Sequence, residues 1–139
     1  MYWLWSMAFE NNFRLEFEIP DLPKRPNQLL KKTAIWLKSA ERKKWLSLVG
    51  AFTAGRRPPI PLERATISLT RHSSVCPDYD GLVLSFKFVI DALVTLGIIE
   101  DDAMVVIGVP LFDWVKAKKN DGKIRVVVAA AGLEPTPSP

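Results

Sequence analysis

Two acidic clusters, separated by one apolar segment, are the residues of this sequence best suited to chemistry. Asp78 and Asp80 lie two positions apart before the segment, and Glu100, Asp101 and Asp102 follow it. Carboxylate oxygens are the ligands that hard cations such as Mg²⁺ and Mn²⁺ prefer. Phosphoryl transfer needs charge neutralised on phosphate oxygens and an activated water, and carboxylate-bound Mg²⁺ supplies both. The clusters therefore indicate phosphodiester chemistry.

The apolar segment between the clusters has the spacing of an amphipathic helix. Its apolar residues recur every three or four positions, at Leu82, Phe86, Val89, Leu93 and Leu96. Gly97 suits the C-terminus of this helix, and Asp80, Lys87 and Asp91 share a second face. We therefore expect the carboxylates of both clusters to converge from the two ends of one helix, with Lys87 in reach of a phosphate.

Charge is unevenly distributed along the chain. The net charge is +4, and the segment from Lys24 to Lys44 holds eight Lys or Arg residues against one acid, Glu41. On the helix predicted over residues 28–49, three basic residues fall on one face: Lys31, Lys38 and Arg42. A basic arm beside an acidic pocket suits a protein that holds a polyanion and positions metal against it.

Each of these patterns also has an interpretation without chemistry. Acidic residues beside a helix are commonly caps or solvated loop residues, and basic residues on a helix face are commonly solvated surface. Both interpretations stay open at this point. The single histidine, His72, gives almost no support for a Ser-His-Asp or histidine-metal site. Without a glycine-rich phosphate loop, we expect no nucleotide cofactor.

The composition is that of an ordinary globular domain. The 139 residues are 48% hydrophobic and 24% charged, which suffices for one buried core. Because Cys76 is the only cysteine, no internal disulfide can form, and we expect a cytoplasmic protein. The apolar opening is too short for a membrane span, so we expect no membrane partner. We expect Met7, rather than Met1, to be the natural start.

Alternation and helix-boundary signals predict the remaining elements. Residues 13–19 and 65–70 alternate between apolar and polar types, as half-buried strands do, and residues 103–109 and 123–130 are β-branched runs that also favour strands. We expect the last two to form a long-looped hairpin. Asn27 is a suitable N-cap for the 28–49 helix, whose apolar face includes Trp45 in the core.

These elements predict a single small α/β (α+β) domain. The order β-α-β-α-β-β gives a mixed sheet with two main helices packed on it. We assign residues 1–12 to an N-terminal extension, 13–132 to the folded domain and 133–139 to a flexible, proline-rich tail.

The acidic stretch also contains an ordered series of short motifs. They are Asp78-Tyr-Asp80-Gly-Leu, Lys87, Asp91-Ala-Leu, Gly97 and Asp101-Asp102, preceded upstream by Ile19-Pro-Asp-Leu-Pro and Pro61-Leu-Glu-Arg-Ala. This series resembles the RusA family of small Holliday-junction resolvases, many of them encoded by phages and prophages. The resemblance is specific over residues 70–102 and weaker, but in order, across 12–130.

The resemblance implies a function and assigns residues to it. It implies Mg²⁺-dependent cleavage of four-way DNA junctions by a homodimer in recombination and repair, with Mn²⁺ as a substitute metal. Its catalytic residues fall on Asp78, Asp80, Asp102 and Lys87, and its metal ligands on Asp78, Asp80, Asp101 and Asp102. Candidate contacts to the DNA backbone are Lys31, Lys38, Arg42, Arg56, Arg57 and Arg71.

One departure from the family pattern keeps other functions open. Gly81 stands where the family has an asparagine that could cap the helix or orient a carboxylate. A junction-binding protein without catalytic activity is therefore the main alternative, and it predicts binding that needs no metal. A nuclease for other branched or flapped DNA and a scaffold whose acids only cap a helix are further alternatives.

Overall fold

Strands built from alternating residues form the centre of the molecule. The computed structural model describes residues 12–24 and 34–131. Within them β1 (Arg14–Ile19), β2 (Ala65–Ser73) and β4 (Lys123–Ala130) bury alternate side chains on one face of a sheet. The strands predicted at 13–19, 65–70 and 123–130 are thereby confirmed, and β2 runs three residues further than expected.

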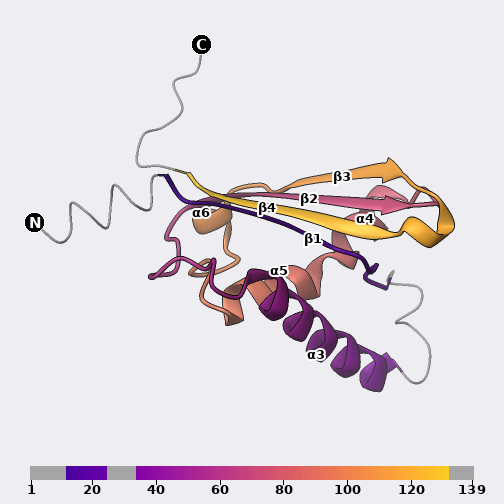
Figure 1. Cartoon of the computed structure of the whole chain (residues 1–139), viewed down its shortest axis with the longest axis horizontal. Helices are drawn as coiled ribbons and strands as arrows, with labels where there is room; N and C mark the ends of the chain where they lie inside the picture. Colours follow the sequence, from indigo (N-terminus) through magenta and orange to yellow (C-terminus); the bar gives the residue numbers. More distant parts are fainter. Residues whose placement is uncertain (1–11, 25–33, 132–139) are drawn as a thin grey trace, which may run out of the picture.

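The sheet is mixed, with strand order β1-β4-β2-β3. β4 pairs antiparallel with both β1 and β2, whereas β3 (Leu111–Lys116) pairs parallel with β2. A parallel pair needs a crossover connection, and the helices after β2 supply it. The long helices α3 and α5 lie on one face of the sheet (Figure 1). The predicted α+β class, with a mixed sheet and two main helices packed on it, is confirmed.

The strand and hairpin predicted from residues 103–109 are wrong. Residues Met104–Ile107 form a single helical turn, α6, which ends at Gly108 with a φ of 60°. Pro110 follows two residues later, so the chain between residues 103 and 110 does not join the sheet. The strand begins instead at Leu111, and its partner is β2 rather than β4.

The first long helix, α3 (Ala34–Thr53), continues one turn beyond the predicted end at residue 49. Its predicted start and its cap at Asn27 lie outside the described residues. Trp45 and Val49 are fully buried, which confirms the core assignment of Trp45. Glu41 is buried on the same face, where its carboxylate accepts a hydrogen bond from Trp45 Nε1.

The helix predicted over residues 82–96 is divided in two. α4 (Tyr79–Ser85) ends at Phe86, from which α5 (Lys87–Thr95) begins. Phe86 is fully buried, and its ring lies 6.1 Å from that of Phe112 in β3. The break between the two helices therefore lies close to β3. Gly97 terminates α5 as predicted: with a φ of 74° it donates to Val94 O, and the next amide bonds Leu93 O.

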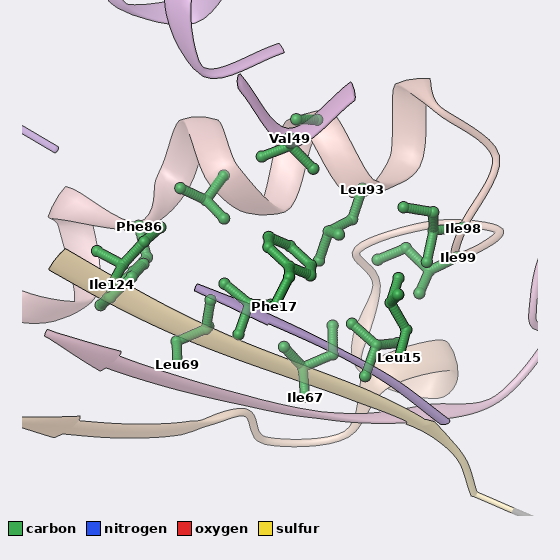
Figure 2. Close-up of a cluster of buried hydrophobic side chains, with 14 of the residues drawn as sticks. Leu15, Phe17, Val49, Ile67, Leu69, Phe86, Leu93, Ile98, Ile99 and Ile124 are labelled. Atoms are coloured by element: carbon green, nitrogen blue, oxygen red, sulfur yellow. The ribbon is translucent and has the colours of Figure 1, made fainter. Parts of the chain in front are cut away.

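The core fills the space between the sheet and these helices (Figure 2). Its labelled members come from β1, β2, β4, α3, α5 and the adjoining segments: Leu15, Phe17, Val49, Ile67, Leu69, Phe86, Leu93, Ile98, Ile99 and Ile124. Because α5 packs on both the sheet and α3, the core fixes the position of its charged residues. Among the described residues, no helix has the length and apolarity needed to cross a membrane.

Candidate functional site

Asp78 begins α4 as its N-cap. Its backbone is extended, with φ −72° and ψ 164°, and its Oδ1 accepts a hydrogen bond of 3.1 Å from the Gly81 amide. Asp80 lies exposed in the first turn of the same helix, where the helix dipole favours a negative charge. Both carboxylates of the Asp-x-Asp pair are thus held at one helix end.

Lys87 and Asp91 form the charged face of α5. Lys87 Nζ lies 3.3 Å from Asp91 Oδ1, one helical turn further along. The Lys87 side chain is 56% exposed and that of Asp91 is 26% exposed, so the pair lies at the surface with its carboxylate partly enclosed. Exposed pairs of this kind contribute little to stability, about 0–1 kcal/mol. Lys87 can therefore exchange this partner for a phosphate at small cost.

A cavity of about 300 Å³ lies between α4–α5 and the α6–β3 segment. Its charged lining consists of Lys87, Asp91 and Asp102, set among apolar residues such as Leu84 and Met104. Asp91 and Asp102 also line a neighbouring cavity of about 290 Å³ together with Arg42 of α3. Two carboxylates and two cations from separate parts of the chain are therefore brought to one region of the surface.

The second acidic cluster has a local structure of its own. The backbone amide of Asp102 donates a 2.8 Å hydrogen bond to Asp101 Oδ1. Both side chains are exposed, and of the two only Asp102 lines the cavities beside α5. Asp101 therefore helps to shape the loop, while Asp102 contributes to the cavities that Asp91 also lines.

The expected convergence of four carboxylates on one spot does not occur within the described part of one chain. No group of three or more histidine, cysteine, aspartate or glutamate residues there could hold a metal ion. Asp78 and Asp80 do not line the cavities that contain Asp102. Asp91 and Asp102 nevertheless match the usual protein contribution to a Mg²⁺ site, which is one or two carboxylates completed by water and substrate phosphate.

Asp91 is the residue of this region that our sequence-based assignment of the site omitted. The signal was present, since Lys87 and Asp91 are four positions apart on a predicted helix and belong to the motif series. Only the fold brings Asp102 to the same cavity. The presence of Asp91 and Asp102 in one cavity therefore could not be predicted from their spacing in the sequence alone.

Arg42 and Lys38 remain suitable for contacts to a polyanion. Both are exposed on α3, and the Arg42 guanidinium lies 5.2 Å from the centre of the Phe88 ring. This cation–π contact orients Arg42 beside the cavity that it shares with Asp91. Lys31 lies outside the described residues.

The three other candidate arginines have structural roles. Arg71 is buried at 6% exposure and donates a 2.7 Å hydrogen bond to Pro23 O. Arg57 donates to Gly50 O and Thr53 Oγ1. Arg56 donates to the carbonyls of Glu16 and Phe52. Arg56 and Arg57 thus bind carbonyl oxygens at the C-terminus of α3, where unpaired carbonyls favour cations. These three side chains are weaker candidates for DNA contact than Arg42.

A second basic region lies on the sheet face opposite α3 and α5, and α6 borders it. A hollow of about 690 Å³ is lined there by Arg14, Arg64 and Arg125, with apolar residues around it. Arg14 and Arg125 both pair with Glu16, which leaves Arg64 as the only one of the three with no ion pair among the described residues. Three guanidinium groups against one carboxylate leave this hollow with a net positive charge, so it is a second surface that suits a polyanion.

Comparison with known proteins assigns no family to this chain. No family model matches the chain, and a search of curated proteins finds no match. The resemblance to the RusA pattern therefore rests on the motif residues of the sequence alone.

Proposed function

We propose that this protein is a Mg²⁺-dependent, structure-selective endodeoxyribonuclease of the RusA type, acting on four-way DNA junctions. The observation that carries the proposal is the joint presence of Lys87, Asp91 and Asp102 in one cavity. All three lie within residues 70–102, where the sequence resemblance is most specific. A cation and two carboxylates at one surface are what phosphodiester hydrolysis requires.

The carboxylates of Asp91 and Asp102 would hold the Mg²⁺. When bound there, the ion supplies neutralisation of phosphate charge and activation of a water. The ammonium of Lys87 binds a non-bridging oxygen of the phosphodiester and stabilises the negative charge that develops on it. Asp80, exposed at the start of α4, is a further acidic side chain available to approaching DNA.

The basic residues of α3 orient the DNA. Arg42 borders the second cavity that Asp91 and Asp102 line, so its guanidinium can bind a phosphate next to the one that is cut. Lys38, one turn earlier, extends the same exposed surface. Binding through these phosphate contacts weakens steeply as salt rises, because each contact releases condensed counterions.

A homodimer fits this activity on symmetry grounds. A four-way junction has two-fold symmetry, and its resolution requires two equivalent cuts. Two copies of the chain would supply two equivalent cavities, one for each strand that is cut.

A junction-binding protein without cleavage is the second candidate. It is favoured by the local roles of two acids, since Asp78 caps α4 and Asp101 binds the Asp102 amide. It is also favoured by the absence of a group of three metal-ligating side chains in the described part of the chain. This candidate predicts binding that is indifferent to divalent metal.

A labelled synthetic four-way junction distinguishes the two candidates. The purified protein is incubated with the junction in Mg²⁺ or in EDTA, next to a linear duplex and a flapped duplex of the same sequence. The nuclease produces paired, symmetric nicks in the junction only when Mg²⁺ is present. Tight junction binding with no cut in Mg²⁺ or Mn²⁺ identifies the binding protein instead, and preferential cutting of the flap would show a different substrate.

A further inference from the structure

Gly81 is buried in the first turn of α4, directly beneath the Asp78 carboxylate. A Cβ atom built on Gly81 would lie 2.4 Å from Asp78 Oδ1 and 3.6 Å from Asp78 Cγ. The first distance is shorter than any ordinary contact between carbon and oxygen. No residue with a side chain can therefore occupy position 81 while the Asp78 carboxylate remains where it is.

The backbone at Gly81 gives no separate reason for a glycine. Among the described residues, the glycines with positive φ are Gly55, Gly97 and Gly108, and Gly81 is not one of them. Within a helix, alanine is intrinsically more favourable than glycine. The requirement for glycine at this position therefore comes from the Asp78 carboxylate.

We infer that Gly81 is a positioning residue, and that its missing side chain sets the direction of the Asp78 carboxylate at the start of α4. In its catalytic consequence this inference rests on the proposed function and on the RusA resemblance, which assigns Asp78 to the catalytic residues. It also explains why this chain has a glycine where the RusA pattern has an asparagine. Glycine at position 81 is then the residue that this particular Asp78 conformation needs, and an asparagine there would turn the carboxylate away.

The displacement should leave the fold intact. Asp78 Oδ1 is the far end of a flexible side chain, so the carboxylate can rotate aside without movement of the backbone. The rotation breaks the hydrogen bond from the Gly81 amide to Asp78 Oδ1. The destabilising effect of substitutions at Gly81 should therefore act through Asp78, and it should vanish when Asp78 lacks its carboxylate.

A double-mutant cycle tests this dependence without reference to catalysis. The variants are Gly81→Ala, Asp78→Ala and the double variant, and the readouts are the thermal midpoint and hydrogen exchange of the residue 81 amide. The control is Gly50→Ala in α3, because a Cβ on Gly50 would meet its nearest atoms at 3.6 Å and 3.7 Å.

The inference predicts a specific pattern in this cycle. Gly50→Ala raises the midpoint, and Gly81→Ala raises it as much only when Asp78→Ala is also present. In the background that retains Asp78, Gly81→Ala raises the midpoint less or lowers it, and exchange of the residue 81 amide becomes faster. Equal effects of Gly81→Ala in both backgrounds would overturn the inference.

Cleavage of the four-way junction tests the catalytic consequence. Gly81→Ala and Gly81→Asn should lower the Mg²⁺-dependent rate by about 10²-fold, the scale expected for a misplaced catalytic group, while Gly50→Ala leaves it unchanged. If the wild-type protein does not cleave, the proposed function fails and the thermal cycle still decides the inference. If it cleaves and Gly81→Asn cleaves equally well, Gly81 does not position a catalytic carboxylate.

Discussion

Trp45 Nε1 donates a 3.0 Å hydrogen bond to Glu41 Oε2, one helical turn earlier on α3, in the interior of the protein. The same carboxylate accepts a hydrogen bond from the Lys24 amide and lies 3.9 Å from the Lys24 ammonium. Glu41 thereby links α3 to the segment that follows β1. An acid on an otherwise apolar helix face, unexplained by the sequence, is thus part of how the helix is attached to the sheet.

Removal of the Glu41 carboxylate should destabilise the fold. Glu41→Ala leaves the buried Trp45 N–H without an acceptor, which costs about 1–3 kcal/mol in the free energy of unfolding. Glu41→Gln keeps an acceptor oxygen and should cost less. Urea unfolding measures both, with the exposed Lys43→Ala as a control expected within about 0.5 kcal/mol of wild type. Equal stability of Glu41→Ala and Lys43→Ala would contradict this role.

The pair formed by Glu16 and Arg125 should make stability depend on acid pH. The hydrogen bond from Arg125 lowers the pKa of the Glu16 carboxyl below its ordinary value of 4.5. Because the folded-state pKa is the lower one, the contribution is fully present above pH 4.5. It declines as the pH falls from there through the folded-state pKa. Unfolding midpoints of wild type and Glu16→Gln, compared from about pH 7 to about pH 2, should converge at the acid end. A difference that grows on acidification would refute the assignment.

Substitution of Arg42 should affect DNA binding, whereas substitution of Arg57 should affect the stability of the fold. Arg42→Ala should weaken junction binding and reduce the salt slope of log K by about 0.9 for each phosphate that is no longer neutralised. Arg57→Ala removes donors to Gly50 O and Thr53 Oγ1, so it should lower stability by about 1 kcal/mol. Its salt slope should stay that of wild type. Fluorescence anisotropy at several salt concentrations measures the slopes; a lower slope for Arg57→Ala, with an unchanged slope for Arg42→Ala, would reverse the assignment.

Asp91 should matter for activity far more than for stability. Its contact with Lys87 is an exposed ion pair, so Asp91→Asn should change the free energy of unfolding by less than about 1 kcal/mol. The Mg²⁺-dependent cleavage rate should fall by about 10²-fold or more, because the substitution removes a carboxylate ligand of the metal. Parallel thermal melts and cleavage rates give both numbers. A variant that is stable and fully active would remove Asp91 from the site.

Local patterns in the sequence were sufficient to predict the elements in which apolar residues recur at regular spacing. β1, β2 and β4 alternate, and Gly97 ends α5 in the conformation that glycine favours. Residues 103–109 were wrongly predicted to form a strand because the prediction relied on their β-branched side chains and not on alternation between apolar and polar residues. There, Met104 and Val105 are both exposed and Gly108 turns the chain.

Features that depend on distant partners could not be predicted. Phe86 divides the helix without a proline or glycine, because its ring packs near Phe112 of a strand that is remote in sequence. The parallel pairing of β3 with β2 is equally non-local. For the candidate site, spacing alone predicted the Lys87 face, whereas the approach of Asp102 to Asp91 depends on the path of the chain after α5.

The central claim is that the acids beside Lys87 support metal-dependent cleavage. The most direct measurement is the rate of four-way junction cleavage in Mg²⁺ by wild type, Asp102→Asn and Asp121→Asn. Asp121 is an exposed acid that lines neither cavity, so its variant controls for removal of one charge. We predict paired cuts by wild type and Asp121→Asn, and no cuts but unchanged junction binding by Asp102→Asn. Equal cleavage by all three proteins, or by none of them, would contradict the account.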